Sequence, residues 1–251
     1  MSTSQASKPG SQQVAGWPPA SVLSPKTSHK WTKEVVFDFH EVCVHWLPRF
    51  CDFVNRSYGY NIRPEQLSFY HMQFDPKCPL TPEQFNEAFV AFARLSEGGY
   101  GTLEPVAGIV EAMNQIKAAG IGIKIWTWTP GAAEQKFEGG SAYQSGIAQR
   151  VTRDLIVKLG LPVNVDRDLR FMQPGMKKWE MAEEHIPLII EDNPETALSV
   201  GLGIAHAAIL VPEPYNEGFA SRNVLRLSNR SELAPTVIDF FKKLEDAGVL
   251  L

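Results

Sequence analysis

Residues 34–39, with the sequence Glu-Val-Val-Phe-Asp-Phe, are the stretch that decides the fold. They form a short apolar run that ends in a carboxylate, Asp38, and such a run is typical of a strand buried on both faces of a parallel sheet. Functional sites in parallel sheets lie at the carboxyl ends of the strands. We therefore expect a buried strand here, with Asp38 at the functional edge of the sheet.

Two more predicted strands also end in polar side chains. Residues 121–128 form an apolar run followed by Thr129, and residues 187–190 form another, followed by Glu191 and Asp192. Strands that alternate with helices predict an α/β fold of the Rossmann type, a parallel sheet covered by helices on both faces. The remaining predicted elements are helices over 104–119, 145–159, 177–185, 194–200 and 232–247, and strands over 169–172, 207–211 and 224–227.

Composition excludes several classes of protein. The chain has 251 residues, 44% hydrophobic and 21% charged, which suits one substantial core. A net charge of −4 argues against binding of a nucleic acid polymer, because neutralising phosphates requires clustered Lys and Arg. The cysteines form no CxxC pair, and no stretch approaches the ~20 apolar residues of a membrane-spanning helix. We expect a cytoplasmic protein that does not enter the membrane.

The chain divides into three parts. Residues 1–30 are rich in Ser, Gln, Pro and Gly and are predicted to be a disordered tail. Residues 44–101 are aromatic-rich and broken by turn signals, with Thr81 placed to cap a helix that begins at Pro82. We interpret this segment as a small helical cap inserted after the first strand. The core would then comprise residues 31–43 and 102–251.

The polar strand ends suggest phosphoryl-transfer chemistry. A carboxylate can attack phosphorus, a hydroxyl can hold a phosphoryl oxygen, and adjacent acids can bind a divalent cation. Asp38, Thr129 and the acidic pair at 191 and 192 supply these groups. A cation to neutralise phosphate is also needed, and Lys177 or Lys178 could supply it from the start of the helix before the acidic strand.

At these residues the sequence resembles the haloacid dehalogenase superfamily. Its four motifs have counterparts, in order, at residues 35–42, 125–129, Lys177 and 189–192, within a resemblance that spans about residues 34–212. Residues 191–197 and 211–216 are most similar to the corresponding stretches of 5'(3')-deoxyribonucleotidases, and place Tyr215 and Asn216 at a site rim. An insertion directly after the first motif also suits this family, which carries its helical cap there.

The resemblance implies catalytic roles. Asp38 would form an aspartyl-phosphate, Thr129 would bind the phosphoryl group, and Lys177 would steady both. We prefer Lys177 to Lys178 by its spacing to Glu191. Phe39, Thr127, Trp128 and Lys178 would contact the substrate.

The resemblance also implies a magnesium cofactor. The ion would bind Asp38, Asp192 and the backbone carbonyl of His40, and Glu191 would support the ion or its waters.

The first motif departs from the family pattern, which is Asp-x-Asp-Gly. Here it is Asp38-Phe39-His40-Glu41. The second aspartate of the family exchanges protons with the leaving group and the attacking water. An imidazole, with an unperturbed pKa of about 6.5, can do the same near neutral pH. Glu41 stands where the family has a flexible glycine, so it either reshapes the metal site or adds an acidic ligand.

Three functions follow from this pattern. The first is a magnesium-dependent phosphomonoesterase acting on a small phosphate ester, most similar to one that hydrolyses (deoxy)nucleoside monophosphates. The second is a related hydrolase that cleaves a carbon–halogen or carbon–phosphorus bond, since such relatives also lack the second aspartate. The third is a catalytically weakened member that binds a nucleotide or a protein. The sequence leaves a homodimer open.

Overall fold

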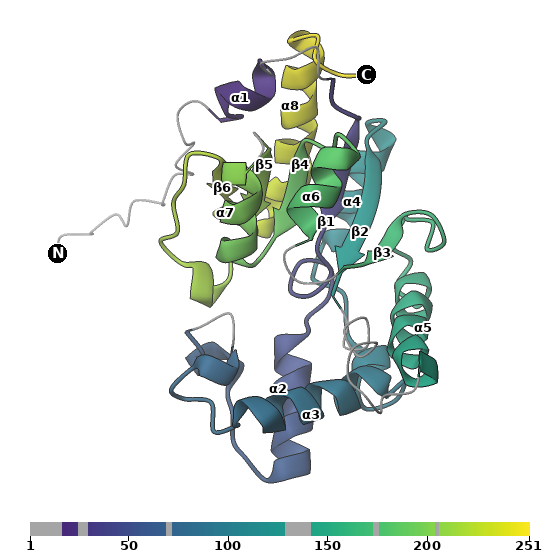
Figure 1. Ribbon diagram of the computed structural model, residues 1–251, viewed down its shortest axis with the longest axis vertical. Helices are drawn as coiled ribbons and strands as arrows, with labels where there is room; N and C mark the ends of the chain where they lie inside the picture. The colour runs from purple at the N-terminus through teal and green to yellow at the C-terminus, as the bar shows by residue number, and fades with distance from the viewer. Residues whose placement is uncertain (1–16, 25–29, 69–71, 129–141, 173–175, 204–205) are drawn as a thin grey trace, which may run out of the picture.

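The computed structural model describes residues 17–24, 30–68, 72–128, 142–172, 176–203 and 206–251 (Figure 1). The α-helices are α1 (Ala20–Leu23), α2 (Leu47–Tyr58), α3 (Pro82–Arg94), α4 (Ile109–Ala118), α5 (Ala142–Lys158), α6 (Lys177–Glu183), α7 (Pro194–Gly203) and α8 (Leu233–Asp246). The strands are β1 (Glu34–Phe37), β2 (Gly122–Thr127), β3 (Leu169–Phe171), β4 (Leu188–Glu191), β5 (Ala207–Leu210) and β6 (Val224–Arg226). Short 3₁₀ turns include η1 (Pro64–Gln66), η2 (Met72–Phe74), η3 (Tyr100–Thr102), η5 (Pro214–Asn216) and η6 (Arg230–Glu232).

The six described strands form one parallel sheet in the order β3-β2-β1-β4-β5-β6. The predicted α/β fold with a parallel sheet is therefore confirmed. Strand β1 lies in the middle, and Phe37 is in register with Ile190 of β4 and Ile125 of β2. This register brings the first residues after β1 beside the last residue of β4.

Helices cover both faces of the sheet. Side chains alternate between the faces along a strand, so Val35 and Phe37 join one apolar cluster while Val36 joins the other. The first cluster contains residues of α4 and α8, among them Met113 and Phe240. The second contains residues of α6 and α7 (Figure 1). Apolar residues fill both faces because a central parallel strand has no solvent-facing side.

The inserted segment forms helices away from the sheet. In Figure 1, α2 and α3 lie together at the end of the molecule toward which the arrowhead of β2 points, and α5 lies against α3. Helix α3 starts as predicted: the Thr81 hydroxyl accepts from the backbone N–H of Gln84, and the side-chain oxygen of Gln84 accepts from the backbone N–H of Thr81. The division of cap from core at residues 44 and 101 stays a prediction.

The N-terminal prediction needs a correction. Residues 17–24 are not a disordered tail, because α1 packs on the core with Val22 fully buried. The indole N–H of Trp31 donates to the Val22 carbonyl at 3.0 Å, and the ring of Trp17 lies 5.2 Å from that of Phe240. A few well-spaced apolar residues thus suffice to dock a segment whose composition is otherwise polar. Residues 1–16 and 25–29 lie outside the described chain.

Within the described residues, no helix combines the length and the apolar character that crossing a membrane requires. Several predicted elements are a little longer than the observed ones. The first strand, for example, ends at Phe37 rather than residue 39, because the chain leaves the sheet at Asp38.

Candidate active site

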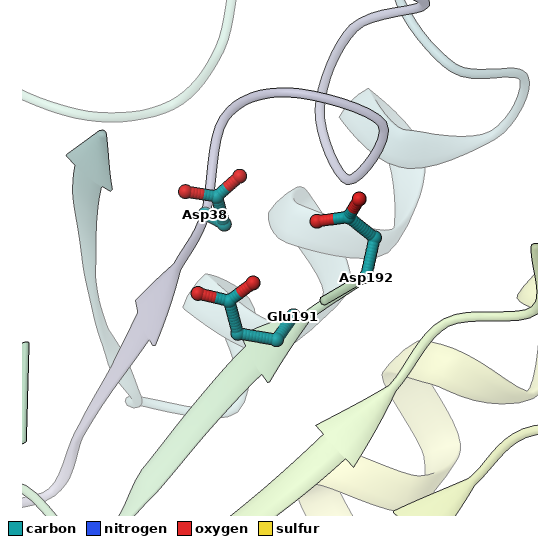
Figure 2. Close-up of side chains that lie close together, drawn as sticks. All are labelled: Asp38, Glu191 and Asp192. Atoms are coloured by element: carbon teal, nitrogen blue, oxygen red, sulfur yellow. The ribbon is translucent and has the colours of Figure 1, made fainter. Parts of the chain in front are cut away.

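Three carboxylates meet at the carboxyl ends of the two central strands. Asp38 directly follows β1, Glu191 ends β4, and Asp192 comes next. Each residue offers an oxygen that lies within 4.8 Å of those of the other two, and all three residues are buried (Figure 2). The parallel register is the cause, since the Asp38 N–H donates to the Ile190 carbonyl at 2.9 Å. The structure therefore brings together the acids that the sequence assigned to metal binding.

Lys177 is the cation of this cluster. Its Nζ lies 2.5 Å from Asp38 Oδ1 and 2.6 Å from Glu191 Oε1, and its side chain is 12% exposed. Burial alone would lower the pKa of Lys177, but the charges of Asp38 and Glu191 outweigh it and raise the pKa overall. The ammonium group is therefore charged, and it offsets the charges of Asp38 and Glu191.

The acids of the cluster oppose one another's ionisation despite this lysine. Burial raises the pKa of Glu191 to about 7, although Lys177 opposes the shift. Burial, followed by the charges of Glu191 and Asp38, raises the pKa of Asp192 well above its usual range. Three buried acids beside one lysine repel one another unless they bind protons or a further cation.

Hydrogen bonds hold Asp192 in place, but only one of its two carboxyl oxygens accepts one among the described residues. Its Oδ2 accepts a hydrogen bond from the Tyr215 hydroxyl at 2.5 Å, and its backbone carbonyl accepts one from Asn216 Nδ2 at 2.9 Å. Its other carboxyl oxygen, Oδ1, is buried and has no hydrogen-bond partner among the described residues. Hard divalent cations prefer such oxygen ligands. The residues therefore fit a divalent cation, which Asp38 and Asp192 would hold with Glu191 beside it.

Glu41 takes the left-handed conformation where the family has glycine, with φ at 52°. Its side-chain carboxylate does not join the acid cluster, because it accepts from the backbone N–H of Leu47 at the start of α2. Its backbone carbonyl accepts from Arg230 at 2.7 Å. Of the two alternatives for Glu41, the structure thus favours a reshaped loop over an added metal ligand.

His40 points into an aromatic environment. Its Nε2 lies 2.5 Å from the Tyr100 hydroxyl, and its ring centroid is 5.7 Å from that of Trp46 and 6.5 Å from that of Phe89. Burial lowers the pKa of His40, although the charges of Asp38 and Glu41 oppose the shift. The imidazole is therefore largely neutral near physiological pH in the absence of substrate.

The predicted substrate-contacting residues differ in their surroundings. The side chain of Phe39 is fully buried, so any contact with a substrate would come from its backbone. Thr127 is fully buried as well, and its hydroxyl donates to the Trp128 carbonyl at 3.4 Å. Trp128 lies 5.0 Å from the ring of Phe89 in α3, where the insertion meets the sheet. Their roles stay predictions.

Two predicted residues cannot be placed. Thr129, the expected phosphate-binding hydroxyl, lies outside the described residues, and so does the side chain of Lys178.

Sequence reasoning missed Tyr100 and Arg230. Tyr100 lies at the far end of the insertion, 60 positions from His40. Arg230 reaches the Glu41 carbonyl across 189 positions. No local pattern marks either residue, because both act through contacts between distant segments. The resemblance suggests that Asn216 lies at the rim of the site. In the structure its side-chain amide donates to the backbone carbonyls of Asp192 and Val211.

Comparisons with known proteins identify the fold. No protein-family profile matches the chain, and no curated protein matches its sequence. Among solved structures, one from Lactobacillus delbrueckii subsp. bulgaricus, provisionally named a phosphoglycolate phosphatase, is similar with a TM-score of 0.54 and 12% identity, covering 83% of this chain and 98% of that one. A haloacid dehalogenase (HAD) family hydrolase from Deinococcus radiodurans R1, solved with bound phosphate and sodium, has a TM-score of 0.48 and 16% identity over 87% and 97% of the two chains. The chain therefore shares its α/β fold with the structure from Lactobacillus delbrueckii subsp. bulgaricus.

Proposed function

We propose that the protein is a magnesium-dependent phosphomonoesterase that works through an aspartyl-phosphate on Asp38. The observation that carries the proposal is the buried cluster in which Lys177 contacts Asp38 and Glu191, while one oxygen of Asp192 has no hydrogen-bond partner in the described part of the chain. A carboxylate, a lysine and two further acids are thereby held in one place, which is what the proposed reaction requires. The similarity in fold to hydrolases supports the same reaction class.

In the first half of the reaction, a carboxylate oxygen of Asp38 forms a bond to phosphorus and the bond to the leaving oxygen breaks. Lys177 offsets charge on Asp38 and on the phosphoryl oxygens. Within the described chain, the backbone N–H groups of Phe39 and His40 donate to no protein acceptor, so they are available to these oxygens. Magnesium, when bound, supplies further charge stabilisation to the phosphoryl group.

We assign the exchange of protons to His40. The negative charge of the bound phosphate favours the imidazolium form of His40, which would give a proton to the leaving oxygen in the first half. In the second half, a water oxygen forms a bond to phosphorus, the Asp38–phosphorus bond breaks, and His40 takes the water proton. Free phosphate leaves and Asp38 is regenerated. Proton transfer of this kind contributes roughly 10²- to 10⁴-fold to a rate.

The substrate that we propose is a nucleoside or deoxynucleoside monophosphate. Its support is an aromatic group formed by Trp46, Phe89 and Trp128 beside His40. The indole N–H groups of Trp46 and Trp128 are buried and lack acceptors within the described residues. A buried N–H without a partner costs about 1–3 kcal/mol, which a ligand carbonyl or ring nitrogen would recover. A flat base with acceptors at its edge suits these walls.

A phosphatase assay tests the proposal. Phenyl phosphate, 2-deoxyribose 5-phosphate and a panel of nucleoside monophosphates would be supplied with and without magnesium, and released phosphate would be measured. We expect magnesium-dependent release, fastest from the nucleotides. Absence of release from every ester would refute the phosphatase, and nucleotide binding without release would leave the weakened binding protein. Halide release from haloacids would instead establish the carbon–halogen hydrolase.

A further inference from the structure

Arg230 joins two loops at the carboxyl edge of the sheet. It lies in η6, which follows β6, and its Nη2 donates to the backbone carbonyl of Glu41 at 2.7 Å and to the carboxylate of Glu213. Nη2 carries two hydrogens, so it can serve both acceptors at once. The side chains of Arg230 and Glu213 are 21% and 16% exposed, so the contact between these distant segments is largely shielded from water.

The first of these loops, residues 38–46, contains a turn that is unfavourable for its residue. Glu41 has φ at 52°, a left-handed conformation that glycine adopts freely and that crowds the side chain of other residues. The Glu41 N–H donates to the Val44 carbonyl at 2.8 Å, and the Val44 N–H donates to the Phe39 carbonyl at 3.1 Å. The N–H groups of Phe39 and His40 are left without a protein acceptor among the described residues. A change of φ at Glu41 would open this turn and release the segment that carries those N–H groups.

The second loop is itself bonded to the acid-bearing segment. It follows β5, and there the Glu213 N–H donates to Asn216 Oδ1 at 3.1 Å. The buried side-chain amide of Asn216 donates to the backbone carbonyls of Asp192 and Val211 at 2.9 and 2.8 Å. Glu213 is therefore a fixed anchor for the guanidinium group.

The contact with Arg230 stabilises the strained turn. Hydrogen bonds from a charged donor are stronger than those between neutral groups, so this contact offsets the cost of the left-handed conformation. We propose that Arg230 is a positioning residue that holds Glu41 in this conformation by fastening it to Glu213. The N–H groups of Phe39 and His40 thereby stay free to bind a phosphoryl group. The benefit to catalysis rests on the proposed phosphatase function, whereas the hold on the turn does not.

The first experiment measures the turn without a substrate. Amide hydrogen exchange of the full chain, followed by mass spectrometry of peptides that cover residues 38–46, reports how often this loop opens. Arg230→Met removes the donors and keeps an apolar stem, so it should speed exchange in the loop about 10-fold and leave exchange in β2 unchanged. Glu213→Ala removes the anchor and leaves Arg230 in place. It should act in the same direction, and it tests the proposal if Arg230→Met does not fold.

Glu41→Gly and Glu41→Ala provide matched backgrounds for this measurement. Both lose the carboxylate contact to the Leu47 N–H, but only glycine adopts a positive φ without strain. Arg230→Met should therefore speed loop exchange by less than about 3-fold in the glycine background and by the full ~10-fold in the alanine background. An equal effect in the two backgrounds, or unchanged exchange in the loop, would overturn the proposal.

The second experiment measures the hydrolysis of phenyl phosphate. Misplaced N–H donors stabilise the developing charge on the phosphoryl oxygens less well, so Arg230→Met should lower kcat about 10- to 100-fold with KM unchanged. An increase in KM with kcat unchanged would show instead that Arg230 binds the substrate, and would contradict the positioning role.

Arg167→Met is the control for the loss of an arginine. Arg167 also pairs with a carboxylate, that of Asp168, but its side chain is 79% exposed. The substitution should leave both loop exchange and kcat unchanged. A wild-type protein that hydrolyses no ester would refute the proposed function, while the exchange measurements would still decide the role of Arg230.

Discussion

The two halves of the candidate site are built in different ways. The charged half, with Asp38, Glu191 and Asp192, is set by the register of two adjacent strands, so its geometry follows from the backbone of the sheet. The aromatic half, around His40 and Tyr100, depends on side chains from the loop after β1 and from the insertion. Parallel pairing thus fixes the positions of the carboxylates, whereas tertiary packing fixes the position of His40.

Replacing Asp38, the proposed nucleophile, should have the largest effect on activity. Asp38→Asn should lower phosphate release by about 10⁴-fold or more, because no carboxylate remains to attack phosphorus. Its thermal stability should not fall, since one of three mutually repelling acids has gone. Assays with phenyl phosphate and a thermal melt by circular dichroism would check both expectations, and retained activity would disprove the assigned nucleophile.

Replacing Lys177 should lower the stability of the fold, because it changes the charge balance of the acid cluster. Lys177→Met leaves the acids without their contact cation, so the free energy of unfolding without metal should fall by about 3 kcal/mol, as measured by urea denaturation. Magnesium should offset part of this loss, because it supplies positive charge to the same carboxylates. Lys178→Met tests the alternative lysine: an effect as large as that of Lys177→Met would contradict the choice between them.

Proton and metal binding should compete at the charged half. The pKa values of Glu191 and Asp192 are raised by folding, so the folded protein binds more protons than the unfolded chain. Without metal, stability should therefore fall as pH rises from about 4.5, the range of a free carboxyl group, to about 7 for Glu191.

Magnesium at a hundred times its dissociation constant should restore about 2.7 kcal/mol near pH 8, and much less near pH 5, where protons hold the site. Thermal melts of the wild type and of Asp192→Asn would measure this. A magnesium response that persists undiminished in Asp192→Asn would place the ion elsewhere.

Glu41 lies in the loop that leads from Asp38 to α2, and its replacement should change the stability of the fold least. Glu41→Ala loses the carboxylate contact to the Leu47 N–H and keeps the strain of a positive φ, so it should destabilise the fold by about 1–2 kcal/mol. Glu41→Gly loses the same contact but relieves the strain, and should be more stable than the alanine variant by about 1 kcal/mol. Denaturant titration of the two variants gives the comparison, and equal stabilities would show that the backbone is not strained there.

The difference between the charged half and the aromatic half explains which site residues could be predicted from the sequence. Short apolar runs ending in polar residues located Asp38, Glu191 and Asp192, because a parallel sheet brings such ends together whatever connects them. Tyr100 could not be found in this way, since its contact with His40 depends on how the insertion folds back. Residues 17–24 were misjudged because composition averages over the few apolar side chains that dock α1.

The backbone bond from the Asp38 N–H to the Ile190 carbonyl has a consequence for protein engineering. It ties Asp38 to the acid-bearing strand at the spacing of neighbouring strands, about 4.8 Å, so exchanging the helices at the far end of the molecule would leave Asp38 beside Glu191. A different segment could thus be grafted in place of α2 and α3 to change the surroundings of His40 while the three carboxylates stay together.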